Sequence, residues 1–231
     1  MPTKGLPERK SRREIVREQQ QKSILRTRLI IVGVFVLLAL IIIYALANAN
    51  KAAKDITAPQ PVTRTTVNGM TAGDPNAKVV VEDFSDFNCV HCADFATGLE
   101  HQLIEEYINT GKILFKYVPM SFISDYSGTA TQAVLCANDQ NKFWEYHDVL
   151  FANYGRVFTN TFLNNVAENL GLDKNTFNSC MTSNKYAAKV TEYNNYATQN
   201  GITSTPTFLV NGVKTDRGSL LQVIETQLNL K

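Results

Sequence analysis

Two cysteines and a histidine lie within four consecutive positions of the segment DFNCVHCADF, which covers residues 86–95. Cys89 and Cys92 have the C-x-x-C spacing, and His91 lies between them. These residue types can bind zinc, form a structural disulfide, or exchange electrons with other thiols. A purely structural bridge is not expected, because a disulfide that closes so short a loop constrains little of the unfolded chain.

A zinc site at this pair would need further ligands from elsewhere in the chain. The other two cysteines, Cys136 and Cys180, stand alone rather than in a second C-x-x-C motif. His101 and His147 have no neighbour at a ligand spacing. We therefore expect no metal at the pair, with a zinc-binding module as a remote alternative.

The position of the pair between a strand and a helix favours redox chemistry. Residues 78–84 (KVVVEDF) are rich in β-branched residues, and a helix is expected to run from the cysteines to about residue 110. Cys89 would begin this helix, where free N–H groups and the helix dipole stabilise an anion. We expect a lowered pKa at Cys89, helped by the imidazole of His91, and a shielded Cys92. A stabilised thiolate favours the reduced pair, so the disulfide should be oxidising.

The remaining elements follow the order of a known architecture. Residues 113–118 predict a second strand, and the strand–helix–strand order predicts a parallel pair. The stretch from about 124 to 200 is helical throughout. Residues 207–215 predict a hairpin around Asn211-Gly212, followed by a last amphipathic helix. A βα unit, a helical block and a ββα unit predict an α/β chain with the thioredoxin fold and a helical insertion.

The N-terminal part of the chain is basic and then apolar. Residues 1–28 contain nine Lys or Arg and three acids, whereas the rest has fourteen bases and eighteen acids. Residues 29–47 contain no charged side chain in 19 positions, enough to span the hydrocarbon of a bilayer as one transmembrane helix. The positive-inside rule places the basic tail in the cytoplasm. We expect a single-pass cell-membrane protein with an extracytoplasmic domain.

Two boundaries follow from the flanks of the apolar segment. Ala45-Leu46-Ala47 has the small-x-small form at which signal peptides are cut, but the long basic region and long apolar run favour a retained anchor. Residues 48–70 are polar and rich in Ala, Thr and Pro, which predicts a flexible linker before a domain at residues 71–231. This domain is mildly acidic, so nucleic-acid binding is not expected.

Three separated motifs resemble the membrane-anchored, DsbA-like branch of the thioredoxin superfamily. The first is GDPNAKVVVEDFSDFNCVHC at residues 73–92. The second pairs AVLCA with KFWEYH, within residues 133–147 of the helical block. The third is TSTPTFLVNG at residues 203–212. The resemblance covers about residues 70–231 and keeps the motifs in the order of that branch.

The resemblance implies a role for each matching residue. Cys89 would be the nucleophile, and Cys92 would resolve the mixed disulfide. Pro206 would be a cis-proline beside the pair, with Thr205 offering backbone groups to a bound peptide. Asp83, six residues before Cys89, matches a buried acid that moves a proton for the resolving cysteine. Such a carboxyl group should have a raised pKa, and a paired or exposed strand acid is the alternative.

Cys136 and Cys180 both fall in the helical block. In an oxidising space, two such cysteines in one subdomain pair more often than they stay free. We therefore expect a structural disulfide between them, with two buried free thiols as the alternative.

These observations predict a thiol:disulfide oxidoreductase that introduces disulfide bonds into exported, unfolded proteins with free thiols. The Cys89–Cys92 redox disulfide would be the working group, so no organic cofactor is needed, and we expect a monomer. The resemblance implies a membrane reoxidase of the DsbB or vitamin K epoxide reductase type. A reductase or isomerase on the same fold is the nearest alternative, because Val90 and Thr205 depart from the most oxidising relatives. A non-catalytic holdase is more distant.

Overall fold

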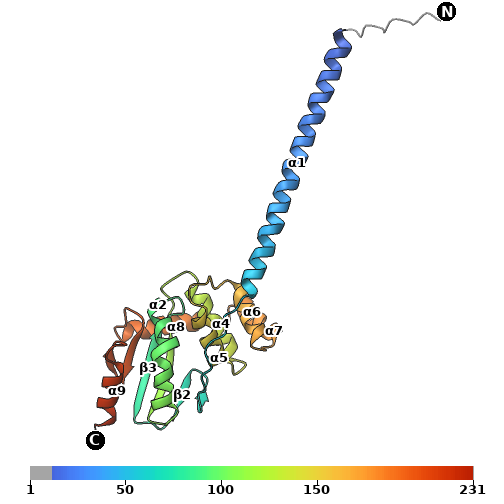
Figure 1. Ribbon diagram of the computed structural model, residues 1–231. Helices are drawn as coiled ribbons and strands as arrows, with labels where there is room; N and C mark the ends of the chain where they lie inside the picture. The colour runs from blue at the N-terminus through green and yellow to red at the C-terminus, as the bar shows by residue number, and fades with distance from the viewer. Residues whose placement is uncertain (1–11, 231) are drawn as a thin grey trace, which may run out of the picture. The chain divides into compact units, whose positions relative to one another are not determined.

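The computed structural model describes residues 12–230, so residues 1–11 of the predicted basic tail and Lys231 lie outside the described residues. The chain divides into two units, residues 1–52 and residues 53–231. The helices and strands of both units are labelled in Figure 1.

The first unit is built on one long helix, α1 (Arg12–Lys54). Its segment Leu25–Leu46 has a mean hydropathy of 3.3 and is long and apolar enough to cross a membrane. By length and composition alone, this helix is a candidate membrane span.

The second unit contains a mixed sheet whose described strands follow the order β1-β2-β4-β3-β5-β6. The central strands β3 and β4 are parallel, as predicted, and every other neighbouring pair is antiparallel. The strands are β1 (Val67–Asn68), β2 (Thr71–Gly73), β3 (Val79–Ser85), β4 (Ile113–Pro119), β5 (Thr207–Val210) and β6 (Val213–Thr215).

One uninterrupted helical rod joins β3 to β4, and we call it the cysteine helix. It combines α-helical and π-helical turns and is followed, after β4, by the predicted helical block. The cysteine helix consists of α2 (Val90–Asp94), η1 (Phe95–Leu99), α3 (Glu100–Leu103) and η2 (Ile104–Ile108). The block contains α4 (Ser127–Asn138), α5 (Phe143–Ala152), α6 (Asn160–Asn169), α7 (Lys174–Thr182) and α8 (Ala187–Gln199), and α9 (Leu220–Leu228) ends the described chain.

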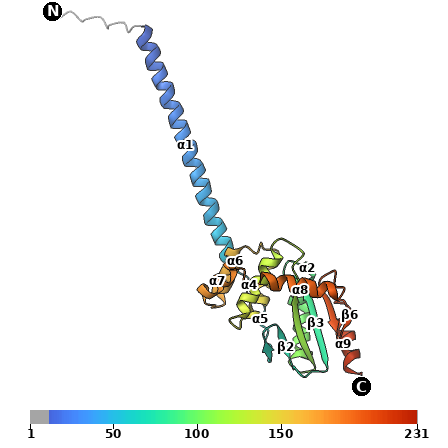
Figure 2. The same cartoon turned by 180° about the vertical axis from the view of Figure 1, so that it is seen from behind.

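The sheet lies between two helical layers, which Figures 1 and 2 show from opposite sides. Side chains of a strand point alternately to its two faces. Val79 and Val81 of β3 belong to the main core with the cysteine helix and α9, whereas Phe84 belongs to a smaller core with α8. Asp83 therefore points to the same side as Val81, toward the cysteine helix.

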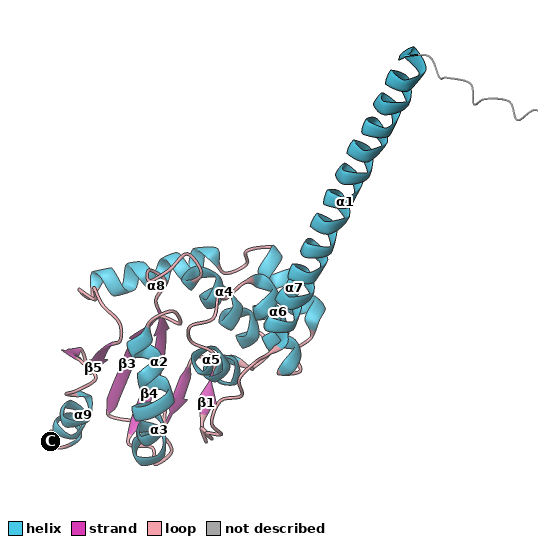
Figure 3. Cartoon of the chain, turned by 45° about the horizontal axis from the view of Figure 1, so that its top comes forward, coloured by secondary structure: helices cyan, strands magenta, loops and turns pink. Residues whose placement is uncertain are grey.

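The predicted hairpin joins β5 and β6, and the sheet and helices of the predicted thioredoxin architecture are present (Figure 3). Asn211 and Gly212 adopt positive φ angles of 49° and 81° between β5 and β6, which the two-residue turn requires. A disulfide joins Cys136 of α4 to Cys180 of α7, with 5.9 Å between their Cα atoms. Two helices of the insertion are thus covalently tied together.

The prediction of a flexible linker over residues 48–70 is wrong. Residues 48–54 continue α1, and β1 lies within the rest of this range. Residues 55–66, which we call the strap, lack regular secondary structure but are fixed to the domain by long-range contacts. Asn153 exchanges two hydrogen bonds with the backbone of Thr57, and Asn109 accepts from the N–H of Thr65. Composition alone could not predict these hydrogen-bond partners, because each lies in a distant part of the sequence.

Candidate active site

Cys89 is positioned by the turn between β3 and the cysteine helix. It is the N-cap residue of α2, and its N–H donates to the carbonyl of Asp86 at 3.0 Å. The pKa of the Cys89 thiol is lowered to about 5, chiefly by a hydrogen bond from the Cys92 thiol. The N–H groups of Cys92 and His91 add to this effect, while burial opposes it. The free donors at the start of the helix therefore favour a thiolate at Cys89.

Cys92 has the opposite environment, one turn further along the helix. It is 0% exposed, whereas Cys89 is 7% exposed. Burial is the largest cause that raises the pKa of the Cys92 thiol, and the hydrogen bond to Cys89 and the charge of Asp83 act in the same direction. The pair is thus asymmetric, with one thiol primed to react and the other shielded.

Asp83 lies in β3 on the side that faces the cysteine helix. It is 1% exposed, and the hydroxyl group of Ser85 donates to its Oδ1 at 2.5 Å. Burial raises the pKa of Asp83 well above its usual range, and the charges of Glu100 and Cys89 raise it further. A buried carboxyl group with a raised pKa holds a proton more readily than an exposed one, which suits a general acid or base.

The segment before β5 closes the other side of the pair. The Thr205–Pro206 peptide bond is cis, and the Cys89 thiol donates to the carbonyl of Thr205 at 3.3 Å. The Thr205 hydroxyl is buried and has no hydrogen-bond partner within residues 12–230. Thr205 also lowers the pKa of Cys89. Because a carbonyl oxygen would repel a thiolate, the hydroxyl group is the part of Thr205 that can stabilise one.

His91 contributes differently from the sequence-based expectation. Its side chain is 72% exposed and its Nδ1 lies 3.9 Å from Oδ2 of Asp94. The group of His91 that lowers the pKa of Cys89 is its backbone N–H. The role predicted for the imidazole of His91 stays a prediction, and its side chain lies mostly in solvent.

Asp86 is an organising residue that the sequence analysis did not identify. Its carboxylate is 0% exposed and accepts from the N–H groups of Asn88, Phe122 and Ile123 and from the hydroxyl of Ser127. One side chain thus joins the cysteine turn to the loop that follows β4. The local signal was an Asp two residues before an Asn, which is typical of an Asx turn.

Exposed apolar side chains lie on these two joined segments, and we call them the apolar rim. Each is more than two fifths exposed, although all are large hydrophobic residues. Exposed apolar side chains beside a reactive group are typical of a surface that binds another chain. The rim consists of Val90, Phe122, Ile123 and Tyr126, with exposed fractions of 43%, 46%, 45% and 42%.

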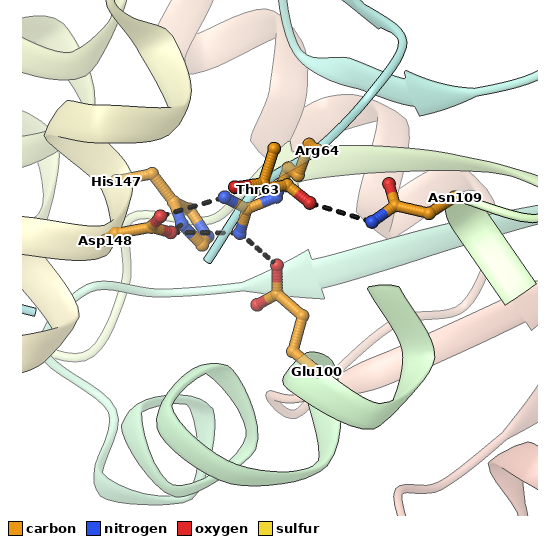
Figure 4. A network of polar contacts seen from close by, with 6 residues as sticks. All are labelled: Thr63, Arg64, Glu100, Asn109, His147 and Asp148. Atoms are coloured by element: carbon orange, nitrogen blue, oxygen red, sulfur yellow. Dashed lines mark hydrogen bonds and ion pairs between the residues drawn. The ribbon is translucent and has the colours of Figure 1, made fainter. Parts of the chain in front are cut away.

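The sequence analysis also missed a buried polar network around Arg64 (Figure 4). Arg64 of the strap pairs with Glu100 of the cysteine helix at 2.7 Å and with Asp148 of α5 at 2.8 Å. The Nδ1 atom of His147 lies 2.9 Å from Oδ1 of Asp148. Within residues 12–230, no group of three or more His, Cys, Asp or Glu side chains is arranged to hold a metal.

The lowered pKa of Cys89 predicts an unusual pH profile for its alkylation. Because the thiolate is the reactive form, the rate with iodoacetamide in the reduced protein should rise with pH around a midpoint near pH 5. Above that midpoint it should be flat, whereas an ordinary thiol becomes more reactive up to about pH 8.5. Reactions quenched at set times and analysed by mass spectrometry would give the alkylation rate at each pH, with urea-unfolded protein as the control. A rate that still climbs between neutral pH and the ordinary thiol range would contradict it.

Comparisons with known proteins agree with this architecture. A family model described as Thioredoxin matches residues 65–228. A probable disulfide bond formation protein D of Bacillus anthracis is 28% identical over 166 residues, which cover 68% of this chain and 76% of that protein. A protein of Salinispora arenicola named Na(+)/H(+) antiporter NhaA 1 is 31% identical over 140 residues. The match covers 61% of this chain but only 21% of that protein.

Solved structures share the fold at low sequence identity. Oxidised BdbD from Bacillus subtilis superposes with a TM-score of 0.64 and 22% identity, covering 76% of this chain and all of that one. DsbA from Chlamydia trachomatis gives a TM-score of 0.61 and 22% identity, covering 73% of this chain and 96% of that one. The fold is therefore DsbA-like, with the helical insertion between β4 and β5. This chain belongs to the thioredoxin family.

Proposed function

We propose that this chain is an extracytoplasmic thiol:disulfide oxidoreductase that introduces disulfide bonds into unfolded exported proteins. The observation that carries the proposal is the asymmetry of the cysteine pair: Cys89 has a pKa lowered to about 5, while Cys92 is fully buried with a raised pKa. A stabilised Cys89 thiolate favours the reduced form of the pair, so the Cys89–Cys92 disulfide is a strong electron acceptor.

The reaction moves two electrons from the client to the cysteine pair. A client thiolate attacks Sγ of Cys89 in the Cys89–Cys92 disulfide, and Cys92 leaves as a thiolate that takes a proton from Asp83. A second client thiolate then attacks the client sulfur of the mixed disulfide. The client disulfide forms and the Cys89 thiolate is released, stabilised by the donors at the helix start.

The client would be held on both sides of Cys89. The cis bond before Pro206 leaves the backbone of Thr205 beside Cys89, where an extended peptide can form hydrogen bonds. The apolar rim offers contacts for hydrophobic side chains that a folded client would bury. Both features can bind an unfolded chain, and neither requires a particular client sequence.

The apolar helix supports a membrane anchor in the same proposal. Leu25–Leu46 is long and apolar enough to cross a bilayer, and the bases of residues 1–28 favour a cytoplasmic N-terminus. The oxidoreductase unit would then face the oxidising side of the membrane, where disulfides persist. Electrons would pass on to a membrane reoxidase of the DsbB or vitamin K epoxide reductase type, which the resemblance suggests.

The redox potential of the pair tests the direction of electron flow. Full-length protein in detergent micelles would be equilibrated against glutathione, and the oxidised fraction counted by alkylation and mass spectrometry. We expect a potential much nearer to about −120 mV than to about −270 mV. A value at the reducing end would favour the disulfide reductase or isomerase. Loss of oxidase activity in Cys89→Ser with unchanged client binding would argue against a non-catalytic holdase.

A further inference from the structure

The buried carboxyl group of Asp86 divides its hydrogen bonds between two segments. Its Oδ1 accepts from the N–H of Asn88 at 2.9 Å and from the hydroxyl of Ser127 at 2.8 Å. A longer bond of 3.4 Å joins the Asn88 amide to the same hydroxyl. Its Oδ2 accepts from the N–H groups of Phe122 and Ile123 at 3.0 and 3.1 Å. One oxygen thus holds the cysteine turn (residues 86–89), and the other holds the loop after β4 (residues 120–126).

The two N–H groups of this loop belong to residues whose side chains are exposed. Phe122 and Ile123 form half of the apolar rim. Because these side chains lie on the surface, the hydrogen bonds of their backbone, rather than core packing, fix their position. The Oδ2 atom of Asp86 therefore determines where this half of the rim stands.

Other side chains hold the two ends of the same loop. The N–H of Ser121 donates to Oδ1 of Asn194 on α8 at 3.1 Å, and Nδ2 of Asn194 donates to the hydroxyl of Ser121 at 2.7 Å. The hydroxyl of Ser127 accepts from the N–H of Ser124 at 3.1 Å. Asn194 joins the loop to α8, whereas Asp86 joins it to the cysteine turn.

The rest of the apolar rim stands next to the residues that Asp86 holds. Val90 directly follows Cys89, and Tyr126 directly precedes Ser127; both side chains are exposed. The rim is therefore assembled from two segments that are distant in sequence. A contiguous apolar patch can bind another chain, whereas apolar side chains scattered singly are ordinary surface.

We propose that Asp86 is a positioning residue for client binding, which assembles the apolar rim beside Cys89 and so favours client cysteines that lie next to apolar side chains. Its carboxyl group acts through Phe122 and Ile123, and the exchange chemistry stays with the cysteine pair. This inference rests on the proposed function, because it assigns the rim to the clients of that reaction.

Exchange with two small disulfides measures this preference. Reduced full-length protein in detergent micelles is mixed with oxidised glutathione, or with the symmetric disulfide of a capped tripeptide that has cysteine between leucine and phenylalanine. The Cys89 thiolate attacks one sulfur of the probe, and one probe thiolate leaves. Cys92 then loses its proton and displaces the second probe thiolate, so the pair is oxidised and the probe is reduced. Acid quenching and intact-mass spectrometry give both rate constants, and the tripeptide-to-glutathione ratio is the selectivity.

Asp86→Ser separates the two functions of the carboxyl group. A serine hydroxyl can still accept from the N–H two residues further on, which keeps the cysteine turn, but serine has no second oxygen for the loop. We expect the selectivity to fall about tenfold, which corresponds to the loss of roughly 55 Å² of apolar contact. The rate with glutathione and the pH profile of Cys89 alkylation should keep their wild-type values.

Asp125→Ser is the matched control, because Asp125 is an exposed acid of the same loop. Its selectivity should equal that of the wild type. Phe122→Ala/Ile123→Ala keeps the backbone N–H groups but removes the apolar side chains, so its selectivity should fall at least as far as in Asp86→Ser. Adding Asp86→Ser to this variant should change the selectivity little further, because Asp86 acts through those side chains.

Three results would overturn the inference: an unchanged selectivity in Asp86→Ser, an equal loss of rate with both probes, or a combined variant in which the two losses multiply. If Asp86→Ser does not fold, Ser127→Ala decides, because it removes the hydroxyl that joins Ser124 to Asp86. Its selectivity should fall in the same direction, and an unchanged value would contradict the inference. Exchange with these probes proceeds whichever way electrons flow in the cell, so the wild-type redox potential tests the proposed function separately.

Discussion

Replacing Cys92 by alanine is expected to arrest the protein as a mixed disulfide with any disulfide-containing peptide. The Cys89 thiolate would still attack the peptide disulfide: the variant loses the largest cause of the lowered pKa, the Cys92 thiol, but keeps Thr205 and the backbone N–H groups at the helix start. The neighbouring thiol that normally displaces the peptide would be absent. Intramolecular attack has so large an effective concentration that the adduct should persist at least about 1,000-fold longer than in the wild type. Non-reducing electrophoresis and intact-mass spectrometry would measure its lifetime.

Cys89→Ala is the matched control for this trap. It leaves Cys92, which is 0% exposed and has a raised pKa, as the remaining thiol of the pair. We expect no adduct from this variant at neutral pH. An adduct that forms in Cys89→Ala but not in Cys92→Ala would reverse the proposed roles of nucleophile and resolving cysteine.

Removing the Cys136–Cys180 disulfide is expected to give the largest loss of stability. The bridge spans 44 positions of sequence. The chain-entropy estimate for a loop of this size is about 4 kcal/mol of unfolding free energy, or roughly 10 °C in melting temperature for a unit of this length. Trp144 is the single tryptophan and is 6% exposed, so its fluorescence would report unfolding of this unit in guanidinium.

The controls use the fact that each cysteine of the bridge contributes to the same bond. Cys136→Ala, Cys180→Ala and the double variant should lose similar amounts of unfolding free energy rather than additive ones. Cys89→Ala/Cys92→Ala, which keeps the bridge, should lose much less. A double variant of the bridge that loses under about 1 kcal/mol would show that helix packing alone holds α4 and α7 together.

Local signals in the sequence were sufficient for the central parts of the fold. A β-branched run before the cysteines predicted β3, and the order of elements predicted its parallel pairing with β4. Asn211-Gly212 predicted the hairpin, because that turn needs two residues that tolerate positive φ. These predictions depend on nearest neighbours and on chain connectivity, and both can be read along a single sequence.

The rest of the site depends on partners that are far apart along the chain. The strap has the composition of a spacer, yet Arg64 is bound to Glu100 and Asp148, at 36 and 84 positions away. The direction of the His91 side chain is set by the surface of the folded helix rather than by its place between two cysteines. Asp86 looks like a local turn residue, and its bonds to the loop after β4 exist only once the sheet has formed.

The carboxylate of Asp86 has a consequence for how clients are selected. Because it binds both the cysteine turn and the loop that carries Phe122 and Ile123, neither segment can shift without breaking hydrogen bonds of a fully buried side chain. The cysteine turn and the loop after β4 are therefore rigid, so the client must change its own conformation to bind. A natively folded protein would have to deform to bring its thiol to Cys89, whereas a nascent or unfolded one adapts at little cost. The rigidity of these two segments thus selects clients whose chains are still flexible.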